Sequence, residues 1–128
     1  MSRAERWTGQ ILSALGVLFL AFDATIKLIG IRPVLDSELV LGLPAGLSFK
    51  LGVLEIILLA LYLVRPTRVL GALLWTGYLG GALLAQLRIG APLWSHILFP
   101  IYIASLLWIP LWIQEPRLRA LLPLDTPA

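Results

Sequence analysis

The chain has 128 residues, of which 59% are hydrophobic and only 13% are charged, whereas about 25% of the residues in an ordinary soluble domain are charged. This composition indicates a protein surrounded by lipid. The length accommodates about four membrane-spanning helices of about 20 residues each, in a single domain over residues 1–128. The net charge of +3 does not indicate nucleic acid, because the ten Lys and Arg residues are dispersed at the ends of the apolar segments. With no cysteine and one histidine, we expect no zinc site, iron–sulfur cluster or paired-histidine haem within one protomer.

The first predicted span covers residues 7–30 and carries two ionisable groups on one face. Asp23 and Lys27 lie one helical turn apart, so their side chains project from the same side of the helix. A charge that faces lipid near the centre of the bilayer costs a few kcal/mol. We therefore expect this face to point into the protein, while Trp7 lies in the interfacial region at the other end of the span.

The second predicted span covers residues 47–64. It follows a connection, residues 31–46, that contains polar residues, prolines and glycines, and we expect this connection to lie along the membrane surface or to fold over the helices as a cap. Lys50 lies one turn inside the span, and Glu55 lies deeper. Because a buried carboxylate needs a partner, we expect Glu55 to pair with Lys50 or Arg88.

The third predicted span covers residues 69–87 and is rich in small residues. A spacing of four residues between Gly77, Gly81 and Ala85 makes a ridge that lets another helix approach closely. The sequence therefore predicts a helix-packing face, within the bundle or between protomers, made of Gly77, Gly80, Gly81 and Ala85.

The fourth predicted span covers residues 94–114. It contains Pro100 and Pro110, which should kink the helix or free backbone carbonyls. His96, near its start, is typical of an interfacial or hydrogen-bonding residue. The serines of the chain have no evident base beside them in the sequence, so the sequence indicates no catalytic nucleophile.

The arginines divide unequally between the two ends of the predicted helices. Six of them gather at one end: Arg3, Arg6, Arg65, Arg68, Arg117 and Arg119. The positive-inside rule predicts that this end, with both termini, is cytoplasmic. The strongly polar side chains within or beside the spans then all lie in the outer half: Asp23, Lys27, Lys50, Glu55, Gln86, Arg88 and His96.

Two interpretations of these seven polar residues are open. In the first, they form a structural ion network that fixes the register of the helices at some cost in stability. In the second, they head an outward-facing pocket with aromatic and aliphatic walls that binds an amphipathic molecule, because ionisable residues inside a membrane are functional candidates by default. We favour the pocket and take the seven residues as its ligand-binding candidates, with no catalytic residue and no metal ligand among them.

Four stretches of the chain carry a family resemblance. They are residues 20–28 (LAFDATIKL), residues 50–55 (KLGVLE), residues 76–82 (TGYLGGA) followed by Leu87-Arg88, and residues 115–119 (EPRLR). Together they resemble the DoxX-like family over nearly the whole chain. The resemblance implies a compact four-helix protein of the bacterial inner membrane, and it maps the family's characteristic positions to Asp23, Lys27, Glu55, Gly77, Gly80, Gly81 and Arg88.

The same resemblance implies a class of ligand. Named relatives in the family include a membrane subunit of an archaeal thiosulfate:quinone oxidoreductase and a mycobacterial membrane partner of oxidative-stress enzymes. These relatives imply a quinone-like cofactor or ligand, or a role as a non-catalytic subunit of a quinone-linked oxidoreductase.

We therefore predict an all-α, antiparallel, left-handed four-helix bundle, integral to the bacterial inner membrane, that binds a quinone-like or other amphipathic small molecule. One alternative is a membrane anchor or assembly subunit without a ligand of its own, bound to a membrane redox partner or to a second copy. A small oligomeric transporter and an enzyme are further alternatives.

Overall fold

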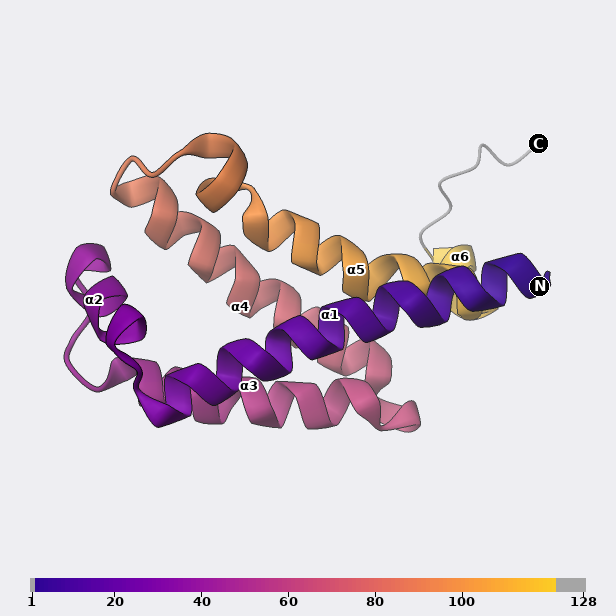
Figure 1. Ribbon diagram of the computed structural model, residues 1–128. Helices are drawn as coiled ribbons and strands as arrows, with labels where there is room; N and C mark the ends of the chain where they lie inside the picture. Colours follow the sequence, from indigo (N-terminus) through magenta and orange to yellow (C-terminus); the bar gives the residue numbers. More distant parts are fainter. Residues whose placement is uncertain (1, 122–128) are drawn as a thin grey trace.

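The structure, a computed structural model, describes residues 2–121. These residues form six α-helices and no strand (Figure 1), so the protein is all-α. The helices are α1 (Arg3–Ile29), α2 (Arg32–Leu41), α3 (Leu47–Leu63), α4 (Arg68–Arg88), α5 (Phe99–Gln114) and α6 (Pro116–Leu121). A 3₁₀ turn, Arg65–Thr67, joins α3 to α4, and a π-helical turn, Leu93–Ile97, precedes α5.

Three segments of the described residues are long and apolar enough to cross a membrane: Arg3–Ile29, Arg65–Arg88 and Leu93–Gln114. They correspond to the first, third and fourth predicted spans. The second predicted span forms α3, which has 17 residues and a length of about 25 Å at 1.5 Å per residue. That length is a few ångströms less than the hydrocarbon core of about 30 Å. The protein is therefore a membrane protein with three helices of spanning length and one shorter apolar helix.

The ends of the first two helices follow from local sequence. Ser2 and Glu5 form a reciprocal capping box at the start of α1, which satisfies two backbone N–H groups. Gly30, with φ of 74°, ends α1, and Gly42, with φ of 70°, ends α2. Residues 31–46 were expected to lie on the membrane surface or to cap the bundle, and the helix that they form contributes side chains to a cavity beside α1, α3 and α4.

The four longest helices pack in a ring, in which α1 and α4 each lie against both α3 and α5. The core contains residues of all four helices and of α6: Leu20, Leu58, Leu59, Tyr62, Ala72, Trp75, Leu79, Ile103, Leu107, Leu111 and Leu118. Two glycines allow close approaches. A Cβ on Gly16 would lie 3.2 Å from side-chain atoms of α5, and a Cβ on Gly71 would lie 2.6 Å from the backbone nitrogen of Tyr62.

The predicted small-residue ridge of α4 makes no such approach. A Cβ built on Gly77, Gly80 or Gly81 would meet no atom of another element within 4 Å among the described residues. Gly77, Gly81 and Ala85 line a cavity instead. Within one protomer, therefore, these glycines do not pack against a helix.

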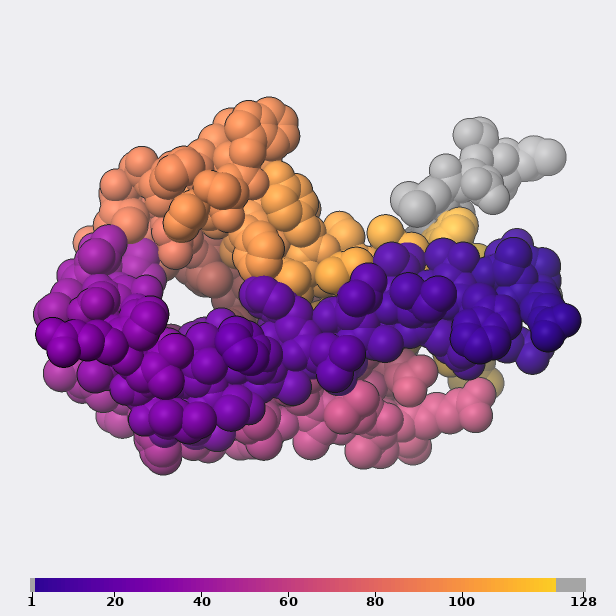
Figure 2. Space-filling view, in the orientation of Figure 1, coloured from indigo at the N-terminus to yellow at the C-terminus, as the bar shows by residue number. Residues whose placement is uncertain are grey.

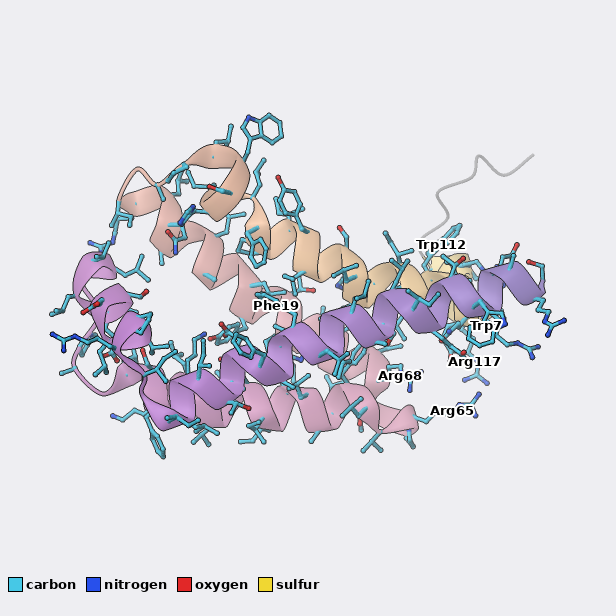
Figure 3. All side chains as sticks on the ribbon, viewed as in Figure 1. Trp7, Phe19, Arg65, Arg68, Trp112 and Arg117 are labelled. Atoms are coloured by element: carbon cyan, nitrogen blue, oxygen red, sulfur yellow. The ribbon has the colours of Figure 1, made fainter. Side chains whose placement is uncertain are left out.

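The two ends of the molecule differ in composition. Trp7, Arg65, Arg68, Trp112 and Arg117 lie together at the end that holds the start of α1 and the turn between α3 and α4 (Figure 3). The helix α2 and the π-helical turn lie at the opposite end (Figure 1). The structure thus brings arginines from distant parts of the chain to one end, as the sequence predicted. Hereafter we call the two ends the arginine end and the α2 end.

Candidate functional site

Lys27 lies at the centre of a polar cluster toward the α2 end. Its Nζ is 2.6 Å from Oδ2 of Asp23 and 3.1 Å from Oε2 of Glu55, and it donates a hydrogen bond of 2.9 Å to the hydroxyl of Tyr78. The Lys27 side chain is 21% exposed and that of Asp23 is 27% exposed. One ammonium group thus connects α1, α3 and α4.

Glu55 is the most deeply buried member of the cluster, with a side chain that is 0% exposed. Although Oε2 lies at ion-pair distance from Lys27, neither carboxylate oxygen accepts a hydrogen bond of good geometry from the described residues. Desolvating a charged group without hydrogen bonds is costly. The Glu55 carboxyl group is therefore held at the expense of stability.

Local sequence explains how α3 brings this carboxyl group to α1. Gly52 precedes Glu55 by three residues, so the two lie on the same face of α3. A Cβ on Gly52 would lie 3.1 Å from the Leu28 side chain and 3.2 Å from the carbonyl oxygen of Ala24. The lack of a side chain at Gly52 therefore lets α3 come close enough to α1 for Glu55 to reach Lys27.

The pairing differs from the sequence prediction. Asp23 and Lys27 do form the expected pair on one face of α1, but Glu55 pairs with Lys27 rather than with Lys50 or Arg88. Lys50 is exposed, and Arg88 donates a hydrogen bond to the carbonyl oxygen of Leu41 at the end of α2. The prediction was wrong for a physical reason, since the connection contains the helix α2 (Arg32–Leu41), whose last carbonyl groups need donors.

Tyr78 is a member of the cluster that the sequence analysis missed. Its ring packs edge-on against Trp75, with centroids 5.4 Å apart, and Lys27 Nζ lies 5.5 Å from its ring centroid. Its hydroxyl oxygen accepts a hydrogen bond from the Lys27 ammonium, so the hydroxyl proton can be donated to another acceptor. The signal in the sequence was a phenol in the middle of an apolar span, where a hydroxyl needs a partner.

A cavity of about 630 Å³ opens beside the cluster, between α1, α2, α3 and α4. The space-filling view shows the opening on the side of α2 (Figure 2). Its lining is mainly apolar, and its polar groups include Asp23, Lys27, Tyr78 and Gln86. Its volume lies within the range of about 300–1,000 Å³ that is typical of small-molecule sites.

A second cavity, of about 220 Å³, lies on the other side of the cluster, between α1, α3, α4 and the π-helical turn with the start of α5. It shares Asp23, Lys27, Tyr78, Ala82 and Gln86 with the larger cavity. Its own lining includes Glu55, His96, Phe19 and Phe99. Phe19, labelled on α1 in Figure 3, makes an edge-on contact with Phe99 at 5.1 Å between centroids. The His96 Nδ1 lies 2.7 Å from the hydroxyl oxygen of Ser95.

Of the seven residues predicted to bind a ligand, the structure places five around the two cavities: Asp23, Lys27, Glu55, Gln86 and His96. Lys50 and Arg88 line neither cavity. In residues 2–121 there is no group of three or more His, Asp or Glu side chains arranged to hold a metal ion. The arrangement offers hydrogen-bond donors and charges to a polar group, beside apolar walls.

Glu38 lines the larger cavity from α2 and fixes α2 to α3. The backbone N–H of Ser48 donates a 2.7 Å hydrogen bond to Glu38 Oε2. Since Gly46 provides no side-chain cap for α3, Glu38 supplies one from another helix. This hydrogen bond holds the pKa of Glu38 below its ordinary value of 4.5.

Comparison with known protein families gives a match over most of the chain. The model of the DoxX-like family matches residues 11–110, a range that includes the cluster and both cavities. No curated protein and no solved structure matches the chain.

Proposed function

The chain belongs to the DoxX-like family, and we propose that it binds a quinone-like or other amphipathic small molecule in the larger cavity. The observation that carries this proposal is a mainly apolar cavity of about 630 Å³ with Lys27, Tyr78 and Gln86 together in its lining. We further propose that the four longest helices form a membrane bundle in the bacterial inner membrane, with both termini cytoplasmic. The arrangement of arginines supports this orientation.

The donors of the cavity suit a carbonyl-bearing headgroup. The Tyr78 hydroxyl proton and the amide N–H groups of Gln86 can be donated to ligand oxygens, and the Lys27 ammonium adds positive charge beside them. The apolar lining, with the glycines of α4, gives space to a ring or chain. A neutral headgroup with acceptor oxygens and an apolar body therefore matches the lining better than a wholly charged or wholly apolar molecule.

Gly81 offers a direct test, because it lines the larger cavity and lies across the helix from the core. We expect the variant Gly81→Leu to fill part of the cavity and to lose the ligand. Gly80→Leu adds the same side chain to the neighbouring position, which lines neither cavity. Native mass spectrometry of gently solubilised protein, with lipid extraction, should find a stoichiometric amphipathic molecule in the wild type and in Gly80→Leu but not in Gly81→Leu. Equal retention in both variants contradicts the proposal.

A second candidate function is a membrane anchor or assembly subunit. The observation that favours it is the uncovered face of α4 at Gly80, where a helix of another protomer or partner would meet no side chain. In that case Gly80→Leu should dissociate a second polypeptide from the solubilised protein, and no small molecule should be found in any variant. The same pair of variants therefore separates the two functions.

A further inference from the structure

The cluster around Lys27 contains one carboxylate in excess. Asp23 and Lys27 face it from α1, Glu55 from α3, Tyr78 from α4 and His96 from the π-helical turn, while α5 contributes only apolar side chains to the lining of the smaller cavity. The formal count takes the phenol and the imidazole as neutral groups. Two carboxylates then face one ammonium group, and the formal charge is −1.

The carboxylate of Glu55 is not exposed to water. Glu55 is 0% exposed, and neither of its oxygens accepts a hydrogen bond of good geometry among residues 2–121. The ammonium of Lys27, 3.1 Å from Glu55 Oε2, is shared with Asp23 and Tyr78, so one positive charge faces two carboxylates. Because an uncompensated charge in a membrane interior is expensive, the cluster must take up one positive charge, which is either a proton or a cation.

The walls of the smaller cavity indicate the chemistry of that cation. Phe19 and Phe99 line it together with Tyr78 and Glu55, and the faces of aromatic rings attract alkylammonium groups. Hard inorganic cations prefer several oxygen ligands, carboxylates above all, and the described residues hold no group of three or more His, Asp or Glu side chains that could bind a metal ion. A volume of about 220 Å³ suits a small cation rather than a long-chain lipid.

We propose that the smaller cavity binds a small monovalent organic ammonium ion, in exchange for one proton shared by Asp23 and Glu55. The cation would place its positive charge against the Glu55 carboxylate and its alkyl groups against the aromatic rings. This site differs from the proposed amphipath site, since Glu55, Phe19 and Phe99 line only the smaller cavity.

Choline is a suitable probe, because 3,3-dimethyl-1-butanol has the same shape without the charge. In calorimetric titrations of the purified protein in detergent, choline should bind and the neutral analogue should not. The affinity for choline should rise with pH by up to about tenfold per unit while one proton is displaced. Titrations in buffers with different ionisation enthalpies should show the release of up to one proton per choline bound.

Glu55→Gln removes the excess charge and keeps the size of the side chain. We expect this variant to lose choline affinity by at least about tenfold and to release no proton. Asp23→Asn should have the same effect, and it keeps the test valid if the Glu55 variant folds poorly. Asp36→Asn is the matched control, because this exposed carboxylate lines neither cavity, and it should bind choline as the wild type does.

Three results would overturn the proposal: no choline binding by the wild type, equal binding of the neutral analogue, or full binding by folded Glu55→Gln and Asp23→Asn. None of these results depends on whether Gly81→Leu loses a retained amphipath, so the two proposals can fail separately.

Discussion

The same helix, α4, uses glycine in opposite ways at the two ends of the molecule. Near the arginine end, Gly71 lies against α3, where a Cβ would be 2.6 Å from the backbone nitrogen of Tyr62. Toward the α2 end, Gly77, Gly80 and Gly81 meet no atom of another element within 4 Å. Gly71 allows α3 and α4 to pack closely, whereas Gly77 and Gly81 line a cavity.

Polar groups follow the same division. Near the arginine end, the hydroxyl of Tyr62 is buried and donates a 2.9 Å hydrogen bond to the carbonyl oxygen of Leu107. Toward the α2 end, the oxygens of Glu55 have no such partner among the described residues, and Tyr78 has a proton to donate. The arginine end of the molecule is thus close-packed, whereas the α2 end leaves space and two carboxylate oxygens without a hydrogen bond among the described residues. The difference supports our proposal that the arginine end supplies stability and the α2 end binds a ligand.

The largest expected effect concerns the polar cluster around Lys27, toward the α2 end. Lys27→Met removes the one ammonium group of the cluster, so Asp23 and Glu55 lose their common partner. Removing one member of a buried ion pair typically costs about 3–5 kcal/mol. We expect a large fall in the thermal unfolding midpoint of the detergent-solubilised protein. Glu55→Gln should change stability little, because Lys27 keeps its 2.6 Å contact with Asp23.

The double variant sharpens this test. In Lys27→Met combined with Glu55→Gln, the most deeply buried carboxylate is gone, so we expect recovery of part of the lost stability. If Lys27→Met unfolds at the same temperature as the wild type, the cluster is not a coupled ion network.

A smaller effect compares two glycines of α4. Gly71→Ala places a methyl group against the backbone of α3, which cannot move as a side chain can, and overpacking of this kind costs about 1–3 kcal/mol. Gly80→Ala meets no neighbour and should gain up to about 1 kcal/mol from helix propensity. Thermal unfolding of the two variants side by side should show shifts of opposite sign. Shifts of the same sign would mean that the two ends do not differ in packing.

Features that depend on one helix at a time could be predicted from the sequence. The pairing of Asp23 with Lys27 follows from 3.6 residues per turn, and three of the predicted spans follow from hydropathy alone. The sequence also predicts that six of the arginines gather at one end of the molecule, because they lie near the two termini and in the turn between the second and third apolar segments. Each of these features requires no knowledge of how the helices are rotated or shifted against one another.

Features that depend on the register between helices could not be predicted. The partner of Glu55 is decided by the close approach of α3 to α1 at Gly52, and several glycines in the chain could have served as that contact. The spacing of Gly77 and Gly81 likewise predicts a surface without side chains, but not whether a helix or a cavity lies against it. The hydrogen bond of Arg88 to Leu41 required knowing that the connection itself is helical.

The smallest expected effect concerns the helix that borders the larger cavity. Glu38→Gln replaces a carboxylate that accepts the Ser48 N–H with a weaker neutral acceptor, so the first turn of α3 should exchange its amide hydrogens a few times faster. The low pKa of Glu38 means that its contribution is complete above its ordinary value of 4.5 and is lost as the pH falls through the lower value in the folded protein. A fall in pH should therefore loosen α2 and the start of α3 in the wild type, and hydrogen exchange measured at decreasing pH should detect this loss of protection. Glu38→Gln should show no such acid transition. Asp36→Asn, which changes an exposed carboxylate of the same helix, should behave as the wild type does. If instead it matches Glu38→Gln, the effect belongs to the charge of α2 and not to the cap on α3.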